Sequence, residues 1–128
     1  ARPLQRRLYR LAHEQLEHNL SLIRAGAGFR DVSRRCWPIP EGLRANRYPM
    51  MIHGVGLTNE WPSIPYDLDW ERDGVDGEIE VGMVLSVESL VAMDGGGEGV
   101  KLEDTVVVER DGARRLSRFE FEAALLAD

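Results

Sequence analysis

The chain has 128 residues, which is enough for one ordinary domain with a single hydrophobic core. Hydrophobic residues make up 43% and charged residues 30%, a composition typical of a folded globular protein. The net charge of -6 argues against nucleic acid as a partner, because nucleic-acid binders usually have a basic face. No apolar run approaches the roughly 20 residues that span a bilayer, so we expect no membrane partner.

Cysteine content bears on the compartment. Cys36 is the only cysteine, so an intramolecular disulfide is excluded. A cytoplasmic location is expected on this ground. Beside Trp37, the thiol is interpreted as part of the core rather than as a catalytic group.

The first predicted element is a helix from about residue 3 to residue 25. Apolar residues recur there at helical spacing, namely Leu4, Leu8, Leu11, Leu16, Leu20 and Ile23. Pro3 suits the first turn and Gly26 suits the stop. A second, short helix is expected over residues 29–36, since Pro38 follows it closely.

Histidines and glutamates on the first helix could in principle pair around a metal. His13 with Glu17, or Glu14 with His18, has the spacing of four that places two side chains on one face. Either pair would still lack the remaining ligands. We therefore interpret these residues as an ordinary solvated helix face.

The pattern after residue 48 is typical of β-structure. Strands are predicted over residues 50–55, 83–91, 100–109 and 114–117, with a hairpin turn at Asp111-Gly112 and a closing helix over residues 119–126. Residues 58–82 form a loop that is longer than usual, which indicates a functional role. The predicted fold class is α+β in one domain.

Three side chains in these strand-like segments are candidate metal ligands: His53, Glu88 and Glu103. A glutamate at a strand centre is unfavourable unless it is paired, exposed or bound to a cation. Two strands joined by the Gly-rich turn near Gly95 can place Glu88 and Glu103 side by side. An imidazole with two carboxylates suits Mn, Fe, Co or Zn. The simpler alternative is that the glutamates are exposed on a half-solvated sheet.

The motifs around these residues resemble a known superfamily. They are His53-Gly-Val-Gly-Leu with Glu60-Trp-Pro, Gly82-Met-Val with Val87-Glu88, and Gly99-Val-Lys-Leu-Glu103-Asp. They look like the C-terminal half of the catalytic domain of the creatinase/aminopeptidase P/methionine aminopeptidase superfamily. The resemblance implies the C-terminal part of a pita-bread fold, a curved antiparallel sheet with helices packed on one face. Residues 1–128 would then form a single partial catalytic domain.

The resemblance also implies a metal centre. The superfamily binds two divalent ions (Fe, Mn, Co or Zn) through two Asp, one His and two Glu residues. By motif match His53, Glu88 and Glu103 are the last three of these five ligands. The two Asp ligands have no counterpart here, because Asp31, Asp67 and Asp69 lie outside the matching motif. The chain is thus expected to be a C-terminal fragment that is inactive when isolated.

A closer likeness is to the dimethylsulfoniopropionate lyase (DddP-type) branch and its Xaa-Pro-peptidase-like relatives. His53 precedes Glu88 by 35 residues and Glu88 precedes Glu103 by 15, as in that branch. Tyr48 matches a tyrosine of the lyase site, so the resemblance implies a catalytic role for it. The implied reaction is abstraction of a proton next to the substrate carboxylate, with release of dimethyl sulfide and acrylate.

One position departs from both branches. Asn59 stands where the lyase has an Asp that is proposed as the base, and an amide does not accept a proton usefully near neutral pH. This weakens both the lyase and the peptidase assignments, and Asn59 could instead orient the substrate.

Partners follow from the resemblance as well. Glu60 and Trp61 are expected to bind a small-molecule or short-peptide substrate, although Trp61 could equally be loop packing. The complete protein is expected to be a homodimer. The alternative is a non-catalytic pita-bread module that binds a peptide or protein partner.

Overall fold

The computed structural model describes residues 1–57 and 60–127. The helical elements are α1 (Pro3–Leu20), α2 (Phe29–Arg35), η1 (Glu41–Leu43), η2 (Asp67–Asp69), α3 (Trp70–Asp73) and α4 (Ala123–Leu126). The strands are β1 (Met50–Gly54), β2 (Ser63–Pro65), β3 (Val84–Ala92), β4 (Gly99–Glu109) and β5 (Gly112–Arg115). The predicted α+β class is confirmed. Within the part of the chain that the structure describes, no helix is both long and apolar enough to cross a bilayer.

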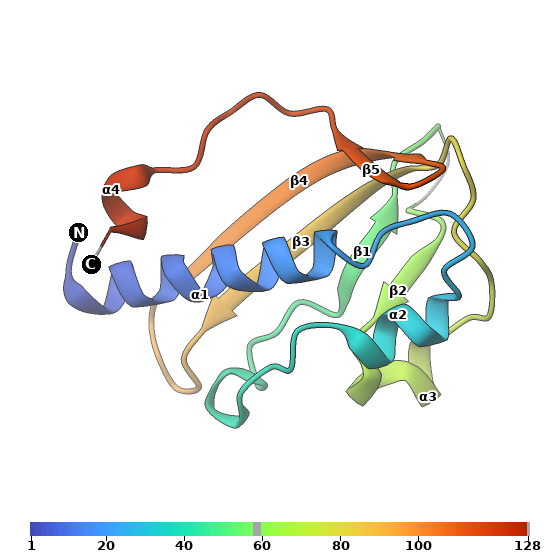
Figure 1. Ribbon diagram of the computed structural model, residues 1–128. Helices are drawn as coiled ribbons and strands as arrows, with labels where there is room; N and C mark the ends of the chain where they lie inside the picture. The colour runs from blue at the N-terminus through green and yellow to red at the C-terminus, as the bar shows by residue number, and fades with distance from the viewer. Residues whose placement is uncertain (58–59, 128) are drawn as a thin grey trace.

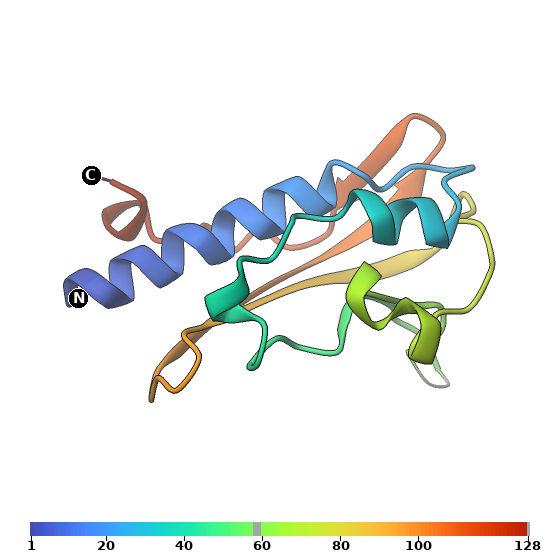
Figure 2. The ribbon, with the colours of Figure 1, turned by 90° about the horizontal axis from the view of Figure 1, so that it is seen from below.

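One antiparallel sheet organises the molecule, with its strands in the order β2-β1-β3-β4-β5. Helix α1 lies across β3 and β4, as Figure 1 shows, and α2 contacts β2. Seen from below in Figure 2, the short α4 comes back beside the start of α1, so the two ends of the chain are neighbours. The sheet therefore has one face that is covered by α1 and one that α1 leaves free.

Helix α1 is held to the sheet by its apolar stripe. Leu8, Ala12 and Leu16 recur every four residues and are fully buried. Burying one such side chain contributes roughly 1.5–3 kcal/mol for the larger aliphatic residues. The stripe thus accounts for the position of the helix over β3 and β4.

A buried polar network fixes α1 in register with the strands. The Ser89 hydroxyl donates to Gln15 Oε1 at 2.8 Å, and Gln15 Nε2 donates to the Tyr66 hydroxyl at 2.5 Å. Burial raises the pKa of Tyr66 to about 12, so the phenol stays protonated. Because Ser89 faces α1, its neighbour Glu88 must face the opposite side of the sheet.

The first helix is shorter than the sequence pattern predicts. It ends at Leu20 rather than near residue 25. Tight turns follow, in which Leu22 N donates to Asn19 O and Ile23 N donates to Leu20 O. These turns carry Ile23 into the core, where it is 2% exposed. The apolar spacing therefore continues past the end of the helix.

Part of the predicted long loop is structured. Strand β2, the helical turn η2 and the short helix α3 all lie between residues 58 and 82. Ile64 of β2 is fully buried and pairs with Ile52 of β1. The sequence does not predict this strand, because Pro62 and Pro65 are typical of turns and edge strands.

The C-terminal elements also differ from the prediction. The closing helix covers only Ala123–Leu126, and Phe119, where it was predicted to begin, is 94% exposed. Glu109 pairs with Gly112, which places the hairpin turn at Arg110-Asp111, one residue before the predicted Asp111-Gly112 turn. Strand β5 accordingly starts at Gly112, earlier than predicted.

Candidate metal centre

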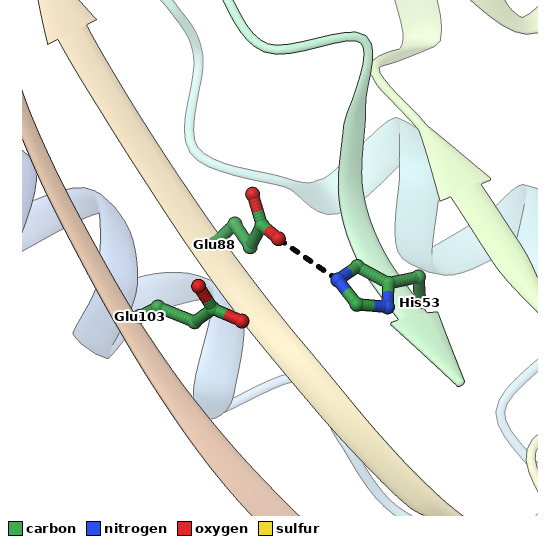
Figure 3. A group of neighbouring side chains, drawn as sticks. All are labelled: His53, Glu88 and Glu103. Atoms are coloured by element: carbon green, nitrogen blue, oxygen red, sulfur yellow. Dashed lines mark hydrogen bonds and ion pairs between the residues drawn. The ribbon is translucent and has the colours of Figure 1, made fainter. Parts of the chain in front are cut away.

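Three adjacent strands bring the three candidate ligands together. His53 on β1 pairs with Ser86 on β3, and Glu88 on β3 pairs with Glu103 on β4. Ser86 and Glu88 are two residues apart and share a face, so His53 and Glu103 lie on that face too. Figure 3 shows the three side chains pointing toward one another, with His53 and Glu88 joined by a hydrogen bond.

The distances fit a cation site. His53 Nε2 lies 2.8 Å from Glu88 Oε1, and one ligand atom from each of His53, Glu88 and Glu103 lies within 4.8 Å of the others. Ligands about 2 Å from a single ion are separated by at most about 4 Å, so small side-chain rotations would suffice. In residues 1–57 and 60–127 this is the one such group of three or more His, Cys, Asp or Glu side chains.

The centre is partly buried and strongly charged. Glu88 is 4% exposed and His53 is 7% exposed, whereas Glu103 is open to solvent. Lys101 Nζ lies 3.0 Å from Glu88 Oε2 and 3.5 Å from Glu103 Oε2. A buried carboxylate requires such compensation, because desolvation disfavours its charged form. Contact with Glu88 also raises the pKa of Lys101.

Tyr48 borders the same cluster. Lys101 Nζ lies 4.9 Å from the centre of the Tyr48 ring, over its face. The tyrosine is half-buried and precedes β1. The structure thus places the predicted catalytic Tyr48 next to the carboxylate cluster, with Lys101 between them.

The imidazole of His53 is held from both sides. Nδ1 lies 3.0 Å from the carbonyl oxygen of Gly54, and Nε2 faces Glu88. Burial lowers the pKa of the ring, but the hydrogen bonds to Gly54 and Glu88 and the charge of Glu60 outweigh it, so the pKa lies above its ordinary value. Because a metal displaces the proton from Nε2, protons compete with metal for this site.

Two supporting residues were missed by sequence reasoning. The Ser86 hydroxyl donates to Glu103 Oε1, and Lys101 bridges the two glutamates. Strand alternation places Ser86 on the face of Glu88 and Lys101 on the face of Glu103. This alternation could have pointed to Ser86 and Lys101, but it does not show which side chains of neighbouring strands are in contact.

The predicted substrate-binding residues lie at the surface. Glu60 is exposed and Trp61 is 59% exposed, and they border a shallow open depression with Met50 and Ser63. Glu60 acts on His53 through its charge, as described above. Asn59, the other predicted catalytic residue, lies outside the described residues.

The three aspartates outside the matching motif have other partners. Asp31 pairs with Arg35 at 3.4 Å, and Asp67 lies 3.9 Å from Arg30. The carboxylate of Asp69 is buried and accepts two hydrogen bonds from Arg47, one of them from Nε at 2.7 Å. These aspartates thus serve surface or structural ion pairs.

Of the two helix pairs considered in the sequence, His13 and Glu17 form a surface ion pair. His13 Nε2 lies 3.7 Å from Glu17 Oε1, and Glu17 also pairs with Arg115. Arg115 Nε lies 2.9 Å from Asp104 Oδ2. The pair therefore belongs to a network that joins α1 to β4 and β5, in agreement with the interpretation as a helix face.

Comparisons with known proteins agree with the motifs. The sequence matches metallopeptidase family M24 over residues 1–110. The dimethylsulfoniopropionate lyase DddP of Roseovarius nubinhibens is 35% identical over 115 residues, which are 90% of this chain and 26% of that protein. The Xaa-Pro dipeptidase of Pyrococcus furiosus is 39% identical over 72 residues, 55% of this chain and 18% of that protein. The chain thus spans about a quarter or less of the length of these relatives.

Solved structures show the same fold. The prolidase from Pyrococcus furiosus superposes with a TM-score of 0.76 at 27% identity, covering 94% of this chain and 34% of that one. The Xaa-Pro dipeptidase from Bacillus anthracis gives a TM-score of 0.75 at 22% identity, covering 94% and 33%. The resemblance to the pita-bread superfamily is therefore confirmed, and so is the fold that it implies.

Proposed function

The chain belongs to metallopeptidase family M24, and from this premise we propose that His53, Glu88 and Glu103 bind a divalent metal ion in the active site of a metal-dependent enzyme. The observation that carries the proposal is the convergence of their ligand atoms within 4.8 Å on three adjacent strands. The chain itself supplies one imidazole and two carboxylates. In the complete site, two further Asp ligands would allow a second ion to bind. Either ion could be Fe, Mn, Co or Zn.

The residues fit such an ion by charge and by donor type. The two carboxylates supply two negative charges, and Glu88 is already held in a buried position by its strand. When bound, the metal would supply Lewis acidity, which polarises a substrate oxygen or lowers the pKa of water. The chain's own part is to fix His53 through the Gly54 carbonyl and Glu103 through the Ser86 hydroxyl.

Lyase-like chemistry on a small carboxylate substrate is the first candidate reaction. It is supported by the similarity to the dimethylsulfoniopropionate lyase, which extends over 90% of this chain. It is also supported by Tyr48, whose ring borders the carboxylate cluster through Lys101. In this proposal Tyr48 contacts the substrate beside the metal, and the products are dimethyl sulfide and acrylate.

A second candidate is hydrolysis of Xaa-Pro peptides. It is supported by the 39% identity to the Xaa-Pro dipeptidase over 72 residues and by the superposition on a prolidase. The two candidates share the metal ligands and differ in the substrate. Trp61 and Glu60 would border the substrate in either case.

One paired assay separates the candidates. The natural protein, loaded with Fe²⁺, Mn²⁺, Co²⁺ or Zn²⁺, is supplied with dimethylsulfoniopropionate or with an Xaa-Pro dipeptide, and dimethyl sulfide or free proline is measured. The lyase candidate predicts dimethyl sulfide that is lost in His53→Ala. Release of proline without dimethyl sulfide would reject the lyase candidate and support the peptidase candidate. Neither product, under all four metals, would favour the non-catalytic binding module.

Asn59 offers a further test of the lyase candidate. An aspartate at this position supplies the proton acceptor that the amide lacks. Asn59→Asp is therefore expected to raise lyase turnover in the natural protein, with Asn59→Gln as the matched control. Equal turnover in the two variants would count against the lyase candidate.

A further inference from the structure

Gly54 lies between a metal ligand and the substrate segment. It is the last residue of β1, directly after His53. Its carbonyl oxygen lies 3.0 Å from His53 Nδ1, and its N–H donates to the carbonyl of Pro62 at 2.7 Å. The residue is buried, so these contacts are shielded from water. One glycine thus touches both His53 and the backbone next to Trp61.

No side chain fits at this position. A Cβ atom added to Gly54 would lie 1.7 Å from the Trp61 carbonyl oxygen, 2.3 Å from its carbonyl carbon and 2.9 Å from Pro62 N. All three are backbone atoms, which cannot rotate away as a flexible side chain can. The close packing of strand β1 against residues 61–62 therefore depends on glycine.

The Gly54 carbonyl also decides which ring nitrogen can coordinate. A histidine ligand usually donates its second ring N–H to a carbonyl or carboxylate, which fixes the tautomer and the ring orientation. Here the carbonyl lies at Nδ1, and Nε2 is the nitrogen that faces Glu88. Two backbone hydrogen bonds hold Gly54 in turn: its own N–H donates to the Pro62 carbonyl at 2.7 Å, and the Val55 N–H, in the same peptide plane as the Gly54 carbonyl, donates to Val84 O at 2.9 Å.

We propose that Gly54 is a positioning residue that couples the metal ligand to the substrate segment. Its carbonyl holds His53 with Nε2 toward Glu88 and Glu103, and its missing side chain lets the Trp61–Pro62 backbone hold that carbonyl in place. Displacing residues 61–62 would therefore turn the imidazole. This inference rests on the proposed metal site.

The direct test compares two glycines of the same segment. A Cβ added to Gly56 meets no atom within 4 Å, so Gly56→Ala is a matched control for Gly54→Ala. Zn²⁺ and Co²⁺ affinities are measured by calorimetric and spectroscopic titration. Loss of a supporting contact to a ligand typically lowers metal affinity about 10–100-fold, and this is the loss expected for Gly54→Ala alone. Unchanged affinity in folded Gly54→Ala would overturn the inference.

A second measurement needs no variant at Gly54. Long-range ¹H–¹⁵N spectra of histidine-labelled protein report the tautomer of each ring, and His53→Gln identifies the signals of His53. The expected result in the Zn²⁺-loaded protein is a proton kept on Nδ1, with the signal of Nε2 shifted by coordination. Coordination through Nδ1 would overturn the inference.

The two proposals fail in different ways. If the wild-type chain binds no metal, the proposed function fails. The Nδ1–H of His53 in metal-free protein, recorded in mildly acidic buffer where the ring carries both protons, still decides the role of Gly54. A rapidly exchanging Nδ1–H would refute the role of the carbonyl, and a slowly exchanging, hydrogen-bonded Nδ1–H would support it.

Discussion

The two faces of β3 carry opposite chemistry. The face toward α1 consists of buried apolar or neutral residues, namely Leu85, Val87, Ser89 and Val91. The other face carries Ser86 and Glu88, beside His53 and Glu103 of the neighbouring strands. Because side chains alternate along a strand, one segment of chain serves the core and the candidate metal site at once.

The comparison teaches that burial alone does not identify a core. Glu88 is 4% exposed and Val87 is fully buried, yet only the carboxylate depends on cations beside it. The apolar face stabilises the fold without a ligand. The charged face is expected to be stabilised mainly by a bound metal ion. Substitutions on either face should therefore separate folding from metal binding.

The largest expected effect is on the apolar face. Leu16 of α1 is fully buried, and Leu16→Ala should lower the free energy of unfolding by about 2–5 kcal/mol through lost burial and a cavity. Metal affinity of the folded fraction should stay unchanged. Urea unfolding and metal titration measure the two quantities, with the exposed Leu4 (44%) replaced by Ala as control. A parallel loss of affinity in Leu16→Ala would break the separation of the faces.

A matched pair of serines sharpens the comparison. Ser86 donates to Glu103 on the charged face, and Ser89 donates to Gln15 on the apolar face. Ser86→Ala should lower metal affinity about 10-fold, toward the lower end of the range for a supporting contact. Ser89→Ala should instead lower the unfolding free energy by about 1–3 kcal/mol, because a buried acceptor loses its donor. Equal effects of both on affinity would contradict the account.

The pH dependence of the free energy of unfolding should change sign when metal binds. The raised pKa of His53 means that, without metal, its interactions stabilise the fold fully below pH 6.5, the unfolded value, and that this stabilisation is lost as pH rises through the folded-state pKa. Metal affinity should behave oppositely, falling up to about tenfold per pH unit below that folded-state pKa. Unfolding measured against pH with EDTA and with Zn²⁺ tests both trends. His53→Gln should abolish them, and their persistence would exclude His53 as the titrating group.

Some of the site could be predicted from the residues alone. The Asp94-Gly-Gly-Gly turn joins β3 and β4 closely, and Gly95 adopts the positive φ of 70° that such a turn requires. A short connection and a two-residue period bring Glu88 and Glu103 together, as the sequence indicates. The position of His53 beside Ser86 depends on a long-range pairing that no local pattern specifies, and only the family resemblance implied it.

The rest depended on tertiary packing. The end of α1 and the pairing of Ile64 with Ile52 depend on which residues the sheet buries. The bridging position of Lys101 depends on side-chain directions on two adjacent strands, β3 and β4. A pattern of apolar and charged residues does not contain this information, since it does not specify which strands pair or which side chains meet across them.

The central claim is that His53, Glu88 and Glu103 form one metal site. Co²⁺ titration of the chain, followed by visible absorption and by elemental analysis after dialysis, tests it most directly. The account predicts a bound ion in the wild type and in His13→Ala, whose histidine lies on α1, and no stoichiometric ion in His53→Ala. Unchanged cobalt loading in His53→Ala would contradict the account.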